Sequence, residues 1–212
     1  MSLLLFSDVS SCIASLAVLA GDDAAATAIV LHADAPLLVE PLLEAFPQMA
    51  AVDIGSARFS RLNFDGIGML VLDFPPASLE SSPGRRLVDV LGRLASEGLA
   101  LVFVGESVSV VGGVLLDGVR AGLNLVPGTA VIADMRAVAD MRTLLGALQA
   151  RGTRLLAMDA PIAVRYDARM DRVRVLGPGS VLLAGFRPAV GDEPPAAQLH
   201  VLTTGMESAW PA

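Results

Sequence analysis

Ser107 occupies the position in the chain where a serine is best placed for chemistry. An apolar run over 99–104 predicts a buried strand, and Gly105-Glu106-Ser107 follows it directly. An apolar segment over 108–116 comes next, which is the layout of a nucleophile elbow, a tight strand-to-helix turn that exposes a serine. Such a serine attacks a carbonyl only with the help of a base and of hydrogen-bond donors for the oxyanion.

Two side chains are candidates for the base. His32 ends an apolar run over 27–32, which predicts a strand, and Asp134 lies beyond a predicted loop over 122–128. If they reach the same edge of a sheet as Ser107, either one can accept the serine proton. The alternatives are structural: His32 is a histidine at the entry to a loop, and Asp134 caps the start of a helix.

Acidic residues gather at the predicted carboxyl ends of the strands. Such carboxylates are ligands of hard cations, and they repel one another unless an ion or a basic group lies among them. The edge of any α/β sheet in an acidic protein looks similar, however, and no Gly-x-Gly-x-x-Gly or Gly-Lys-Ser/Thr motif follows a strand. We therefore expect no metal and no cofactor, and we expect Glu106 to be an exposed turn residue. The five acids are Asp8, Asp34, Asp73, Glu106 and Asp134.

The composition indicates a soluble domain with a large core. Of the 212 residues, 54% are hydrophobic and 17% charged, and the net charge is −7. All 15 basic residues are arginines scattered along the chain, so no basic patch is expected to bind nucleic acid. The single cysteine, Cys12, excludes an intrachain disulfide. No basic segment precedes the apolar N-terminus and no apolar run approaches 18 residues, so we expect a cytoplasmic protein without membrane contact.

The alternation of apolar runs with helix-like segments predicts a single α/β domain over 1–212. Continuous apolar strands between helices are typical of a three-layer sandwich with a mainly parallel, flavodoxin-like sheet. After a helix over 134–151, closely spaced strands predict antiparallel hairpins that extend this sheet. The predicted strands are 3–6, 27–32, 51–54, 68–73, 99–104, 154–158, 162–166, 172–176, 181–184 and 199–203, and the other predicted helices are 11–20, 37–46 and 85–95.

Four segments of the C-terminal half carry a family resemblance. They are Gly122-Leu-Asn-Leu-Val-Pro-Gly128, the run 155–159 with the strand after it, the hairpin 173–181, and the closing strand 199–205 with His200. In order and spacing they resemble the cyanophycinase and dipeptidase E family of serine peptidases. The resemblance implies a class I glutamine-amidotransferase-like fold, Ser107 at the nucleophile position and a structural role for His200.

The chain departs from that family at every other catalytic position. The family's elbow reads Gly-Thr-Ser-Ala-Gly-Ala, whereas this chain has valine and serine after Ser107. The family's histidine falls at or beside Asp134, and its acid falls on Ala160. The loop that helps to form the oxyanion hole is replaced by Leu72-Asp-Phe-Pro-Pro76, and proline has no N–H to donate.

Two functions follow from these matches and departures. The first is a catalytically degenerate protein, a homodimer with a binding or scaffolding role and a small peptide or amino acid as its ligand. The alternative is a divergent serine hydrolase that acts on β-aspartyl or Asp-Xaa peptides, with Ser107 as nucleophile and His32 or Asp134 as base.

Overall fold

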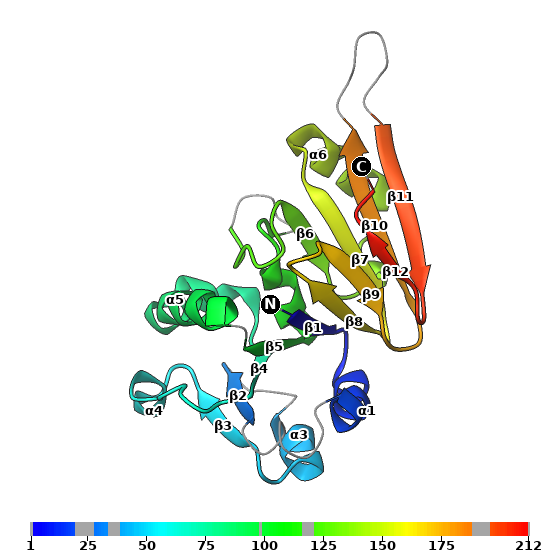
Figure 1. The fold of residues 1–212 in the computed structure, drawn as a ribbon. Coiled ribbons are helices and arrows are strands. Elements are labelled where there is room, and N and C mark those ends of the chain that lie inside the picture. The colour runs from blue at the N-terminus through cyan, green and yellow to red at the C-terminus, as the bar shows by residue number, and fades with distance from the viewer. Residues whose placement is uncertain are drawn as a thin grey trace.

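An eight-stranded sheet forms the centre of the molecule (Figure 1). The structure is a computed structural model that describes residues 2–19, 28–33, 39–97, 99–115, 121–187 and 196–211. From edge to edge, the strands are β12 (Glu207–Ala209), β9 (Arg172–Val175), β8 (Ala163–Asp167), β1 (Ser2–Phe6), β5 (Ala100–Val104), β4 (Met69–Asp73), β2 (Ala28–His32) and β3 (Ala50–Asp53).

The sheet is parallel on one side of β1 and antiparallel on the other. β1 pairs in parallel with β5, and the parallel order continues through β4 and β2 to β3. On the other side, β1 pairs antiparallel with β8. β8 pairs antiparallel with β9, and β9 pairs antiparallel with β12. The predicted mainly parallel α/β sheet with antiparallel C-terminal strands is therefore confirmed. The carboxyl ends of five parallel strands lie at one edge, where ligands of such sheets bind.

The other described strands form a second sheet. It contains β11 (Ala196–Thr203), β10 (Ser180–Arg187), β7 (Arg154–Asp159) and β6 (Thr129–Ile132) in that order. The predicted hairpins are thus divided, because β7 pairs with β6 and β10 whereas β8 pairs with β1. Among the described C-terminal strands, β8, β9 and the short β12 extend the main sheet.

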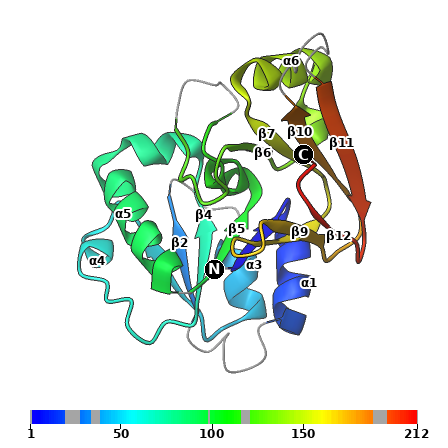
Figure 2. The same ribbon diagram turned by 45° about the horizontal axis from the view of Figure 1, so that its top comes forward.

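Helices and the second sheet cover the main sheet on both faces. α1 (Val9–Leu19) and α3 (Val39–Ala45) pack on one face, through a core that includes Cys12, Leu16 and Leu42. The other face shares a larger core with α5 (Ser82–Glu97), with a 3-10 helix after β5 and with the second sheet. α6 (Met141–Arg151) packs on the outer face of the second sheet, as Figures 1 and 2 show.

The predicted helices are present except for the one over 134–151, which is wrong as a continuous helix. A 3-10 turn over Met135–Ala137 precedes α6, and an aspartate starts each of them. Asp134 accepts a hydrogen bond from the Arg136 amide, and Asp140 accepts one from the Thr143 amide. Each carboxylate therefore caps the start of its own helical segment, and the segment over 134–151 is divided in two. In the described residues, no helix is long and apolar enough to span a membrane.

Arg154, at the start of β7, joins the second sheet to the main one. Its guanidinium donates to an Asp171 carboxylate oxygen at 2.7 Å and to the Pro127 carbonyl at 2.8 Å. It also lies over the Trp210 ring, 4.3 Å from the ring centre. Asp171, in the turn between β8 and β9, accepts a second hydrogen bond from the Tyr166 hydroxyl at 2.8 Å. The two sheets are therefore linked by a charged group as well as by their common core.

Candidate functional site

The turn after β5 is where the sequence places the candidate nucleophile. It leads into a 3-10 helix, Gly105–Val111, that contains Ser107. The residue of this turn in the left-handed region is Gly105, with φ of +60°, whereas the described non-glycine residues with positive φ lie elsewhere, at Asn124 and Asp171. A left-handed backbone is unfavourable for residues with a side chain, and here a glycine adopts it. Ser107 lies two residues further along the chain.

The Ser107 hydroxyl is fully buried and bonded to the backbone. Its oxygen accepts a hydrogen bond from the Val104 amide at 2.9 Å. Its single proton is shared between the carbonyls of Leu72, at 2.7 Å, and Val104, at 2.8 Å. The side chain has 0% exposure. The hydroxyl therefore connects the end of β4 to the turn after β5 and does not face solvent.

His32 lies at the same edge of the main sheet as the turn that contains Ser107. It ends β2, in register with Asp53 on β3 and Asp73 on β4. β4 lies between β2 and β5, and the Ser107 hydroxyl bonds to the Leu72 carbonyl of β4, one residue before the β4 partner of His32. The Nδ1 atom of His32 is buried without a hydrogen-bond partner in the described structure.

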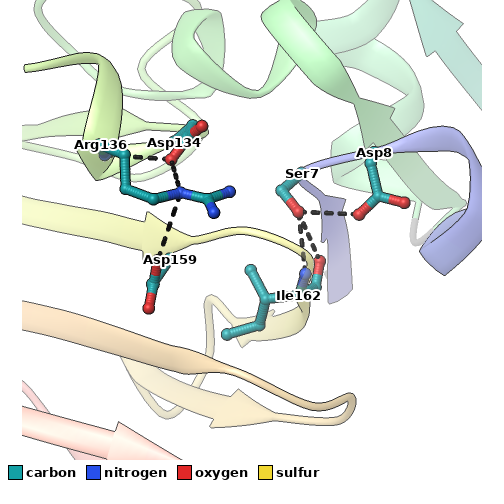
Figure 3. A network of polar contacts seen from close by, with 6 residues as sticks. All are labelled: Ser7, Asp8, Asp134, Arg136, Asp159 and Ile162. Atoms are coloured by element: carbon teal, nitrogen blue, oxygen red, sulfur yellow. Dashed lines mark hydrogen bonds and ion pairs between the residues drawn. The ribbon is translucent and has the colours of Figure 1, made fainter.

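Asp134 belongs to an ion cluster at the ends of β6 and β7 (Figure 3). The Nε atom of Arg136 lies 3.0 Å from Asp134 and 3.6 Å from the carboxylate of Asp159, the last residue of β7. The side-chain hydrogen bond from Arg136 lowers the pKa of Asp134, and the same bond raises the pKa of Arg136. Sequence reasoning missed Arg136 and Asp159, although the short step from Asp134 to Arg136 was a signal.

Ser7 and Asp8 follow β1 and form hydrogen bonds with neighbouring segments at this edge (Figure 3). The Ser7 hydroxyl accepts a hydrogen bond from the Ile162 amide at 2.8 Å and contacts an Asp8 oxygen at 3.0 Å. Asp8 also accepts from the amide of Ser11 at 2.9 Å, which caps the start of α1. These two side chains are therefore engaged in connecting β1 to α1 and to the segment before β8.

The remaining predicted residues are spread apart. Glu106 is exposed, and His200 is exposed on β11 with its Nδ1 atom 3.3 Å from the Ser208 hydroxyl. Asp34 lies outside the described residues. Among those that are described, no group of three or more His, Cys, Asp or Glu side chains could hold a metal ion.

The arrangement of strands and helices is that of peptidase E-like proteins. A peptidase from an acI-B1 Actinobacterium superposes with a TM-score of 0.66 at 13% identity, over 99% of this chain and 96% of that one. A provisional peptidase E from Listeria monocytogenes EGD-e gives a TM-score of 0.59 at 8% identity, over 82% of this chain and 96% of that one. No protein-family model and no curated protein sequence matches the chain. At these identities the likeness establishes the fold, and the site must be judged on its own geometry.

Proposed function

We propose that the chain is a catalytically degenerate protein on a peptidase E-like fold that binds an amino acid or a short peptide without hydrolysing it. The observation that carries this proposal is the state of the Ser107 hydroxyl. A nucleophile must present its oxygen to the substrate and pass its proton to a base. The Ser107 oxygen is instead buried, and its hydrogen bonds go to backbone groups of Leu72 and Val104.

The candidate bases support the same proposal. Asp134 is held by Arg136, and a carboxylate whose pKa is lowered by a cation is a poor proton acceptor. The Ser107 hydrogen bonds in the described structure go to backbone groups, and the buried Nδ1 atom of His32 has no hydrogen-bond partner there. General-base catalysis contributes about 10²–10⁴-fold in rate, and one oxyanion donor contributes about 10²–10³-fold. Without both, little peptide hydrolysis is expected.

The ion cluster at β6 and β7 suits a zwitterionic ligand. The described contacts of the Arg136 side chain with Asp134 and Asp159 are all made by Nε. Its two terminal nitrogens point away from both carboxylates in Figure 3, toward the side where Ser7 lies. A guanidinium in this position can bind a carboxylate through two parallel hydrogen bonds, while Asp159 attracts an ammonium group. An amino acid or a peptide terminus carries both groups.

Labelling with a fluorophosphonate probe tests the loss of catalysis. We expect no labelling of the folded wild-type protein by intact mass, and no difference from the Ser107→Ala variant. Labelling of the wild type that disappears in Ser107→Ala would overturn the proposal and establish the divergent hydrolase. In that case, hydrolysis of β-aspartyl and Asp-Xaa dipeptides would be measured next.

Calorimetric titration with aspartate, Asp-Ala and β-aspartyl-alanine tests the ligand class. We expect at least one of them to bind the wild type and to lose about tenfold or more in affinity in Arg136→Ala, since a charged hydrogen bond contributes about 1.5–3 kcal/mol. The control is Arg142→Ala, which removes an exposed arginine on α6. Binding that is unchanged in Arg136→Ala, or equally weakened in both variants, would contradict this site.

A further inference from the structure

β11 forms an open edge of the second sheet. It is the last strand of that sheet, and no strand pairs with its other side in the part of the chain that the structure describes. Leu199 is 50% exposed and Val201 is 60% exposed, although both are large apolar side chains. Figures 1 and 2 both show β11 along the outside of the molecule.

The sequence of β11 lacks the features that protect edge strands in natural proteins. Its sequence, Ala-Ala-Gln-Leu-His-Val-Leu-Thr, contains no charged residue, no proline and no glycine. With eight residues, β11 is as long as β10. A long, uncharged, apolar edge with free backbone N–H and C=O groups is a template for another strand.

We propose that this other strand is β11 of a second copy of the chain, paired antiparallel about a twofold axis. The two strands have equal length, and neither has a charge that would repel the other. A twofold interface brings the same surface of both copies together, so the exposed apolar side chains of one copy cover those of the other. The result is a continuous eight-stranded sheet across the dimer.

The apolar residues also select a register. The twofold axis is perpendicular to the sheet, so residues directly opposite each other point to the same face. Centring the pair on His200 places Leu199 opposite Val201 of the partner subunit, and Val201 opposite Leu199 of the partner subunit. Cross-strand apolar pairs of this kind stabilise a sheet. On the same face, Leu182 and Ala184 of β10 lie beside Val201 and Leu199 and belong to the core that α6 covers.

The size of the contact sets the expected strength. Eight residues span about 27 Å, which covers less than the roughly 800 Å² per partner of a standard interface. We therefore expect a dimer that dissociates in the micromolar range. This inference does not depend on the proposed ligand or on the loss of catalysis.

Sedimentation velocity of the full chain from 1 to 200 µM measures this association. We expect Val201→Glu to raise the dimer dissociation constant at least tenfold, because it buries a carboxylate in each half of the contact. The matched control is Met170→Glu in the turn between β8 and β9, since Met170 is also 60% exposed. A wild type that is monomeric at 200 µM, or a dimer weakened as much by Met170→Glu, would overturn the proposal.

A disulfide tests the register. Opposite residues in antiparallel strands have Cα atoms about 4.5–5.5 Å apart, which fits a disulfide. His200→Cys is therefore expected to give a cross-linked dimer on a non-reducing gel after mild oxidation, and Leu199→Cys much less. The native Cys12 is buried and does not compete. Cross-linking through Leu199→Cys alone would refute this register, and no cross-link in either variant would refute the edge pairing.

Discussion

The hydroxyl of Ser107 forms hydrogen bonds with the backbone of two neighbouring strands. It accepts the Val104 N–H and donates to a carbonyl at the end of β4 or β5. In Ser107→Ala, the buried Val104 amide loses its partner, and an unsatisfied buried donor costs about 1–3 kcal/mol. We expect the free energy of unfolding to fall by that amount, measured by urea denaturation.

Ser109 provides the control within the same 3-10 helix. Its hydroxyl donates to the Glu106 carbonyl at the surface. Ser109→Ala is therefore expected to change the free energy of unfolding by less than about 0.5 kcal/mol. An equal loss of stability in the two variants would contradict the structural role that we assign to Ser107.

Cys12 illustrates a side chain whose chemistry is suppressed by its surroundings. Burial against the main sheet, and then the charges of Asp8 and Asp73, raise the pKa of its thiol far above the ordinary value. The reactive thiolate is therefore scarce, and access to it is closed. We expect no rapid reaction of the native protein with Ellman's reagent at pH 8, and one reactive thiol per chain in urea. Fast labelling of the native protein would show that α1 separates from the sheet.

At the scale of residues, the sequence predicts positions better than orientations. The sequence places Ser107 two residues after Gly105, but it does not show whether the hydroxyl faces solvent or the backbone. Capping of a helix by Asp134 could be predicted, because aspartate before a helix is common. The approach of Arg136 to Asp159 could not, since it depends on β6 and β7 lying side by side.

At the scale of elements, strands were easier to predict than their partners. The apolar runs that became β1, β2, β4 and β5 are buried on both faces, and such runs are conspicuous. The short β6, β12 and the one-turn helix Ala57–Ser60 were missed because three or four residues carry little periodicity. The second sheet could not be predicted, because hairpin signals do not reveal which strand pairs with which.

The link between Arg154 and Asp171 predicts a pH dependence of stability. Burial opposes ionisation of Asp171, but hydrogen bonds from Arg154 and Tyr166 outweigh it and lower the pKa of this carboxyl. The carboxylate therefore stabilises the fold above its unfolded pKa, near the ordinary value of 3.8, and loses this effect as the pH falls. Asp171→Asn is expected to cost roughly 1 kcal/mol at pH 7, with a smaller difference at pH 3.

Asparagine suits this test because it tolerates the φ of +49° at position 171. The control is Glu207→Gln, which breaks an exposed ion pair with Arg172. Unfolding curves between pH 3 and pH 7 should show little effect of the control. A loss in Asp171→Asn that is the same at every pH would contradict the ionic origin.

At the scale of the whole molecule, one core belongs to both sheets. Leu156 of β7 and Leu183 of β10 lie in the same apolar cluster as Leu3 of β1 and Phe103 of β5. We expect the two sheets to unfold together. Leu156→Ala should destabilise the protein by about 2–5 kcal/mol and speed amide exchange in both sheets. The exposed control Val88→Ala should leave exchange unchanged, and a loss of protection confined to the second sheet would contradict a common core.

The closed turn at Ser107 also limits how the chain can be engineered. Introducing a histidine at position 134, where the family resemblance implies one, would leave the Ser107 hydroxyl bonded to Val104 and Leu72. Freeing this hydroxyl would require rebuilding the ends of β4 and β5, whose backbone groups bind it. Under the proposed loss of catalysis, a screen for restored hydrolysis should therefore combine several substitutions around this turn and not test them singly.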